Sequence, residues 1–233
     1  MNGRILPEAI TATSFIRIWK DYDFVLYFRN SLGVTLVAVL ISLVASTLTG
    51  YGATRFNFRG KNTFLSFILM TQMFPSIMLL VPFYKILSVY GLNNSLVGLC
   101  IVYVSFTIPF CSWMMVGYFR TIPTEIDESA AIDGASHLQT FWKIALPLVK
   151  PGLVSSAIYA FITCWNEYMF AAILLVNDKL KTAAVAIAEM NGYYKIAWND
   201  MMAASLVASV PLIIAFVFMQ KSFISGLTAG AVK

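Results

Sequence analysis

Five segments of this 233-residue chain are apolar over the length needed to cross a lipid bilayer, which is about 20 residues. They lie near residues 30–53, 63–86, 96–119, 152–176 and 202–220. Every backbone polar group in hydrocarbon needs an internal partner, so segments of this length cross the membrane as helices. The sequence therefore predicts an all-α integral membrane protein, a polytopic helical bundle with five visible transmembrane helices.

The composition supports this class. Hydrophobic residues make up 59% of the chain and charged residues 12%, with a mean hydropathy of +0.78, whereas a soluble domain is about 25% charged. A soluble protein could not hide so much apolar surface. The net charge of +5 could suggest nucleic acid, but the basic residues are scattered at the span ends, as membrane-flanking charges are. We therefore expect lipid, and no nucleic acid, as a partner.

Two kinds of residue in the spans predict how the helices pack. Small residues recur every four positions along the first span, at Ala38, Ser42, Ser46 and Gly50. Such a stripe lets two helices approach closely. Prolines occur in the second, third and fifth spans, where they predict kinks that either shape the packing or act as hinges along a pathway.

A polar segment, residues 120–150, joins the third and fourth spans, and we call it the polar loop. Thr124 followed three residues later by Asp127 predicts a capping box at the start of a first helix. Gly134 predicts the end of that helix, because glycine adopts the left-handed turn at a helix C-terminus most easily.

A second short helix follows in the polar loop. Ser136 and Gln139 are spaced as a capping box, which predicts its first turn. Its apolar residues fall at i, i+3, i+4 and i+7, and predict one apolar face: Leu138, Phe141, Trp142 and Ala145. Two short helices that meet at a glycine form a rigid unit suited to pressing against another protein.

The polar loop resembles the signature of the membrane subunits of bacterial ABC importers. That signature reads Glu-Ala-Ala, three residues, Gly, nine residues, then Ile-x-Leu-Pro. The matching residues, in register, are Glu128, Ala130, Gly134, Ile144, Leu146 and Pro147, and Ser129 replaces the first alanine. An ordinary amphipathic connector between spans is the alternative interpretation, and it does not account for this register.

The resemblance implies that the polar loop lies in the cytoplasm and carries a coupling helix that contacts an ATPase subunit. The interface residues implied by the match are Glu128, Ser129, Ala130, Asp133, Gly134, Ala135, Phe141, Ile144, Leu146 and Pro147.

A second motif, Trp165-Asn166-Glu167-Tyr168, lies in the fourth span and contains the only acid well inside any span. A charge within the membrane is costly and usually faces a cavity or a partner, which makes Glu167 a functional candidate. A glutamate satisfied by a neighbouring helix is an equally open interpretation. The C-terminal sequence from Gly226 lies beyond the last span, so that we expect a flexible tail there.

Both segments resemble the carbohydrate-uptake branch of the same family. The resemblance implies a bacterial inner-membrane assembly with a second homologous permease, two ATPase subunits and an extracytoplasmic sugar-binding protein. It also implies that the tail contacts the ATPase through Gly226, Thr228 and Gly230. We expect Trp165, Asn166, Glu167 and Tyr168 to serve the translocation path or gate, because an acid in the membrane needs water or a partner, and the tryptophan and asparagine beside it suit a sugar.

Catalytic chemistry has little support in the sequence. The single histidine, His137, cannot form a histidine-based metal cluster or triad, so we expect no metal. The three cysteines lie in apolar spans and are expected to be small buried residues. The sequence around Gly60 lacks the first glycine and the Ser or Thr of a phosphate-binding loop. We expect no enzyme, with ATP and magnesium held by the partner ATPase subunits.

The topology follows from the basic residues. With the polar loop inside, lysines and arginines divide equally between the two sides, but three of them cluster within residues 55–61 and favour that orientation. Residues 1–29 are then extracytoplasmic, residues 30–220 form the transmembrane domain, and residues 221–233 are a cytoplasmic tail. Because the family usually has six spans, we expect its first helix to be missing from this chain, through truncation or a misplaced start.

Other functions are compatible with parts of this pattern. Another solute, such as a polyol, a glycerophosphodiester or an amino acid, would use the same fold. An ion-coupled secondary transporter or a channel would need several ionisable residues in the membrane or inverted repeats. A membrane scaffold would leave the capped polar loop unexplained. The sequence does not specify which sugar is carried.

Overall fold

The computed structural model describes residues 11–192 and 197–231, with side chains up to residue 217. In chain order its helices are α1 (Thr13–Lys20), α2 (Phe24–Arg55), α3 (Lys61–Thr71), η1 (Ser76–Leu79), α4 (Leu80–Val89), α5 (Leu96–Arg120), α6 (Thr124–Ile132), α7 (His137–Thr140), η2 (Phe141–Ala145, a π-helix), α8 (Leu146–Leu148), α9 (Lys150–Trp165), α10 (Met169–Leu174), η3 (Asp178–Leu180), α11 (Ala183–Glu189) and α12 (Trp198–Ala231).

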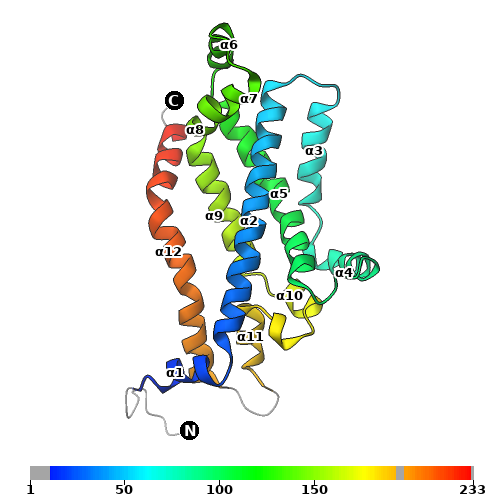
Figure 1. Cartoon of the computed structure of the whole chain (residues 1–233), viewed down its shortest axis with the longest axis vertical. Helices are drawn as coiled ribbons and strands as arrows, with labels where there is room; N and C mark the ends of the chain where they lie inside the picture. The colour runs from blue at the N-terminus through cyan, green and yellow to red at the C-terminus, as the bar shows by residue number, and fades with distance from the viewer. Residues whose placement is uncertain (1–10, 193–196, 232–233) are drawn as a thin grey trace.

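Four long helices, α2, α5, α9 and α12, run side by side along the long axis of the molecule (Figure 1). The polar loop forms one end of this bundle, and α1, α10 and α11 lie at the opposite end (Figure 1). Three continuous stretches are long and apolar enough to span a membrane: α2, α5 and residues 198–217 of α12. The predicted all-α membrane bundle is confirmed.

The second predicted span is broken. In place of one helix over residues 63–86, α3 ends at Thr71, and η1 with α4 continues at an angle of 94° to it. Pro75 stands at the break with extended backbone. Proline has no N–H to donate and disfavours helical backbone in the residue before it, which explains the break.

The fourth predicted span is also interrupted. The helix expected over residues 152–176 ends at Trp165, and α10 starts at Met169 as a separate short helix. At its other end, α9 meets the helices of residues 137–148 at an angle of 74°. The flexible tail predicted from Gly226 is wrong up to Ala231, because α12 continues to that residue as helix.

Helices α2 and α5 pack most extensively, and the small residues of α2 explain why. Ala38, Ser42 and Ser46 are fully buried. Ser42 and Thr107 join the two helices through a hydroxyl–hydroxyl hydrogen bond of 2.6 Å. At Gly50 the approach is so close that an added Cβ would lie 2.7 Å from the Cβ of Met115. The predicted small-residue stripe is confirmed as the α2 contact surface.

Candidate functional site

The first helix of the polar loop, α6, begins one residue earlier than expected. Thr124 was predicted to be its N-cap, but Pro123 occupies that position and no side chain caps the helix. Proline has no amide hydrogen to leave unpaired and so tolerates a helix start. The predicted end is confirmed: Gly134 has φ +82°, and its N–H donates to the carbonyl of Ala131 at 3.0 Å.

The second helix of the polar loop starts as predicted. Ser136 and Gln139 form both bonds of the capping box: the Ser136 amide donates to the Gln139 side-chain oxygen at 2.9 Å, and the Gln139 amide donates to the Ser136 hydroxyl at 3.3 Å. Because α6 and α7 are both fixed by local hydrogen bonds around Gly134, the polar loop has a defined shape.

Of the apolar face predicted for the second helix, half is buried and half is exposed to solvent. Phe141 and Ala145 are buried, with 4% and 1% of their surfaces exposed, while Leu138 and Trp142 are 66% and 59% exposed. The apolar face of this segment is wider than the part of the bundle that it packs against, so only Phe141 and Ala145 lie inward. The exposed half leaves two large apolar side chains at the end of the bundle.

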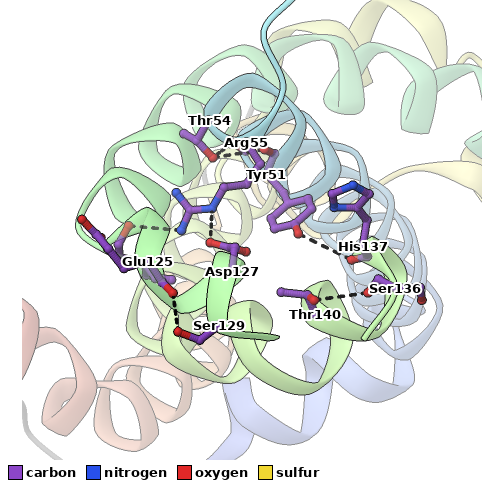
Figure 2. A network of polar contacts seen from close by, with 11 residues as sticks. Tyr51, Thr54, Arg55, Glu125, Asp127, Ser129, Ser136, His137 and Thr140 are labelled. Atoms are coloured by element: carbon purple, nitrogen blue, oxygen red, sulfur yellow. Dashed lines mark hydrogen bonds and ion pairs between the residues drawn. The ribbon is translucent and has the colours of Figure 1, made fainter. Parts of the chain in front are cut away.

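A buried ion pair holds the polar loop against the bundle. The Arg55 guanidinium, at the last residue of α2, lies 2.7 Å from the Asp127 carboxylate on α6 (Figure 2). The same guanidinium donates to the carbonyl of Ile122 at 3.1 Å, in the turn that follows α5. Our sequence analysis missed this pair, because it assigned Asp127 to a local cap and Arg55 to topology.

Tyr51, one turn before Arg55, contacts the second helix. Its hydroxyl donates to the carbonyl of His137 at 3.5 Å (Figure 2). Its ring packs against Phe119 of α5 and Phe141 of the polar loop, with centroid distances of 5.6 Å and 4.9 Å. The end of α2 therefore contacts both short helices of the polar loop.

The ten interface residues that the importer signature implies divide into two groups. Ala130 and Phe141 are buried, and Ala135, Ile144 and Leu146 are half-buried, so that they fix the shape of the polar loop. The exposed ones are Glu128, Ser129, Asp133, Gly134 and Pro147. Together with Leu138 and Trp142, the exposed group offers both carboxylates and large apolar side chains to another protein.

At the other end of α9, Glu167 is held by hydrogen bonds. Its carboxylate accepts the amides of Phe170 at 2.7 Å and Ala171 at 3.1 Å, and the Tyr103 hydroxyl at 3.2 Å. An anion at a helix N-terminus is stabilised by the unpaired amides and the helix dipole. Glu167 thus stabilises the first turn of α10, and the interpretation that a neighbouring helix satisfies this acid has direct structural support.

The other residues of the motif point to different surroundings. Trp165 is buried, and its indole N–H donates to the carbonyl of Ala208 on α12 at 3.0 Å. Asn166 and Tyr168 are exposed, and the Asn166 amide donates to the carbonyl of Ile162 at 3.0 Å. The structure therefore joins Trp165 to the helix packing and leaves Asn166 and Tyr168 accessible.

Asn166, Glu167 and Tyr168 line a cleft of about 440 Å³, which we call the Asn166 cleft. Its remaining lining includes Gln72 and Ser76 from the broken second span and Phe106, Tyr159 and Thr163 from α5 and α9. Our sequence analysis missed these residues, because the cleft exists only where two spans are interrupted. Pro75 was the one sequence signal that pointed to such an interruption.

Two further predictions concern metals and the tail. Within residues 11–192 and 197–231, no group of three His, Cys, Asp or Glu residues could hold a metal ion. The three cysteines are buried and unpaired with one another. Gly226, Thr228 and Gly230 lie in the last turns of α12, where side chains are outside the described part of the chain.

An apolar helical bundle with a capped polar loop at one end and a cleft between interrupted helices fits a membrane transport subunit. The chain belongs to the family described as "Binding-protein-dependent transport system inner membrane component", whose family model matches residues 42–228. The importer permease predicted from the polar loop, and its place in the inner membrane, are thereby confirmed. This is a family of transport subunits, not of catalytic enzymes.

Individual relatives are similar over the whole chain. The inner membrane ABC transporter permease protein YcjP of Escherichia coli (strain K12) is 36% identical over 100% of this chain and 84% of its own length. The trehalose/maltose transport system permease protein MalG of Thermococcus litoralis is 36% identical, over 100% and 85%. A solved bacterial ABC transporter that imports the acidic polysaccharide alginate has a TM-score of 0.80 at 27% identity, covering 95% of this chain and 83% of that chain.

Proposed function

We propose that this permease moves a neutral sugar or oligosaccharide into the cell, driven by ATP hydrolysis on partner subunits. The observation that carries the proposal is the polar loop, whose buried and half-buried residues fix its shape while Glu128, Gly134 and Pro147 of the signature stay exposed. Relatives named for trehalose, maltose and maltodextrin transport support a sugar as the solute.

The proposed assembly contains a second homologous permease, two ATPase subunits and an extracytoplasmic sugar-binding protein. ATP and magnesium bind to the ATPase subunits. In this assembly the polar loop is cytoplasmic, and Leu138 and Trp142 insert into an apolar groove of the ATPase. Glu128 and Asp133 pair with basic residues around that groove, and Gly226, Thr228 and Gly230 contact the same subunit. Large apolar anchors surrounded by charges are the usual arrangement of an energetically strong interface.

ATP drives transport through this interface. When the two ATPase subunits close on ATP, they displace the docked polar loop, and the attached helices move between inward-facing and outward-facing arrangements. ATP thereby acts as a ligand that favours one of two states, and it shifts the equilibrium by its difference in affinity for them.

The Asn166 cleft is proposed as part of the translocation path. Phe106, Tyr159 and Tyr168 supply aromatic faces, and Gln72, Thr163 and Asn166 supply neutral hydrogen-bonding groups. A few polar groups among aromatic side chains suit a small-molecule site, and about 440 Å³ lies within the range of such sites. The lining favours a neutral solute, because the one carboxylate in it already accepts three hydrogen bonds.

The test is purification of the protein with its native partners, followed by uptake in proteoliposomes. We expect an ATPase and a second permease to copurify, and ATP-dependent uptake of maltose or trehalose when the binding protein is added. The variant Asn166→Ala should lower uptake while the complex still assembles. Copurification of no ATPase would overturn the importer assignment. Uptake of an amino acid or a polyol, with none of any sugar, would overturn the solute class.

A further inference from the structure

The pair of Arg55 and Asp127 differs from the other ion pairs found within the described residues. It alone among them joins the polar loop to a membrane span, and the two residues are far apart in sequence. The side chains are only 7% and 19% exposed. An exposed ion pair is screened and contributes little, whereas breaking a shielded pair is costly because it leaves one charge without its partner.

The contacts of Arg55 extend beyond this pair. Its guanidinium also holds the Ile122 carbonyl at 3.1 Å, so that one side chain joins α2 to the turn after α5 and to α6. By chain connection alone, the polar loop is attached only to α5 and α9. The Arg55 contacts add a third attachment, to a helix that is distant in sequence.

The other end of α2 is attached as well. Near its start, the Asn30 side-chain amide donates to the carbonyls of Lys179 at 2.9 Å and Lys181 at 3.0 Å, and the Ser31 hydroxyl accepts the amide of Ala183 at 2.8 Å. These residues belong to the segment from η3 to α11, at the end of the molecule opposite the polar loop (Figure 1). With 32 residues, α2 is about 48 Å long at about 1.5 Å per residue.

We propose that Arg55 and Asp127 are positioning residues that make α2 and α6 move as one body. A displacement of the polar loop is then transmitted along α2 to residues 179–183, on the opposite side of the membrane. This proposal rests on the proposed function, in which an ATPase displaces the polar loop. It adds that α2, and not only the covalently attached α5 and α9, carries the motion.

The direct test measures the distance between α2 and α6 in the complete complex. Spin labels at Asn57→Cys, two residues beyond the end of α2, and at Glu125→Cys on α6 report on the two sides of the ion pair, and both positions are exposed. We expect one narrow distance distribution, unchanged between the nucleotide-free complex and the complex trapped with ATP and vanadate. Arg55→Gln should broaden the distribution in both states, and the charge swap Arg55→Asp with Asp127→Arg should narrow it again. Arg59→Gln, an exposed arginine just beyond α2, is the matched control and should change nothing.

The functional test is the ratio of stimulated to basal ATP hydrolysis, measured with the binding protein and maltose or trehalose. Arg55→Gln should lower this ratio by about fivefold or more, with basal hydrolysis retained. If that variant fails to assemble, Arg55→Lys, which keeps the charge but loses the guanidinium geometry, should show the same broadening to a smaller extent. A narrow distribution and a normal ratio in both variants would overturn the proposal.

A further variant separates this proposal from the proposed function. If Gly134→Val abolishes stimulation while the Arg55 variants keep it, the polar loop couples to the ATPase, and only the role of the ion pair is refuted. If Gly134→Val also keeps normal stimulation, the coupling function of the polar loop is itself refuted.

Discussion

A close contact between α2 and α5 makes Gly50 sensitive to the addition of a single methyl group. A methyl group built at Gly50 would lie 2.7 Å from the Cβ and 2.9 Å from the carbonyl carbon of Met115, and 3.0 Å from a ring carbon of Phe119. Two of these atoms belong to the fixed part of α5, so the clash cannot be relieved by a side-chain rotation. Gly50→Ala must therefore move α2 and α5 apart.

The expected loss of stability in Gly50→Ala is worked out by comparison with Gly52, a second glycine of α2. At Gly52 an added Cβ meets nothing within 4 Å. Both alanine variants gain the same helix propensity, about 1 kcal/mol. The difference between them is therefore the cost of overpacking, about 1–3 kcal/mol. For a protein of this size, that cost corresponds to a melting temperature about 2–12 °C lower for Gly50→Ala than for Gly52→Ala.

The assay is the thermal unfolding of the two variants and the unmodified protein, purified in the same detergent. Size-exclusion chromatography after heating gives the temperature at which half of the folded protein is lost. We expect Gly52→Ala to match or exceed the unmodified protein and Gly50→Ala to fall below it. Equal stability of the two alanine variants would show that α2 and α5 are not in the close contact described here.

Substitutions at three other positions test separate parts of the molecule. Gly134→Val places a β-branched residue at φ +82°, which should cost about 1–2 kcal/mol and abolish uptake, whereas Gly134→Asn should retain it. Glu167→Leu removes the carboxylate that accepts the amides of Phe170 and Ala171 in the first turn of α10, and should cost about 1 kcal/mol, while Glu167→Gln should assemble normally but transport more slowly. Native uptake by both Glu167 variants would make the residue purely structural. A cysteine at Asp21 should react with a membrane-impermeant reagent from outside the cell, and labelling only from the cytoplasm would reverse the topology.

The parts of the site that depend on neighbours in sequence were predictable. The left-handed Gly134 and the capping box of Ser136 and Gln139 are set within a few residues, and both were predicted correctly. The capping box predicted at Thr124 failed because Pro123 already starts the helix. Apolar segment lengths identified the membrane spans, but they did not show where a span is interrupted.

The interactions between distant residues were beyond the reach of the sequence. Nothing local to Arg55 or Asp127 indicates that they meet, because the pairing depends on how α2 and α6 pack. The role of Glu167 could not be predicted for the same reason. Because the segments on both sides of it are apolar, the sequence suggested an acid within one continuous helix. The structure shows instead that the acid forms the helix start that interrupts the span.

The break in the second span, after α3, bears on which part of the subunit can contact lipid. The 11 residues of α3 cover about 16 Å, which is about half of the hydrocarbon thickness. If α3 starts at the membrane surface, residues 72–75, all exposed in this chain, would lie close to the middle of the bilayer with backbone that is not helical. Such backbone is tolerated at that depth only where protein or a water-filled cavity covers it. That side of the subunit is then unsuited to contact with lipid tails, and we expect it to face another protein or a water-filled cavity in the assembly.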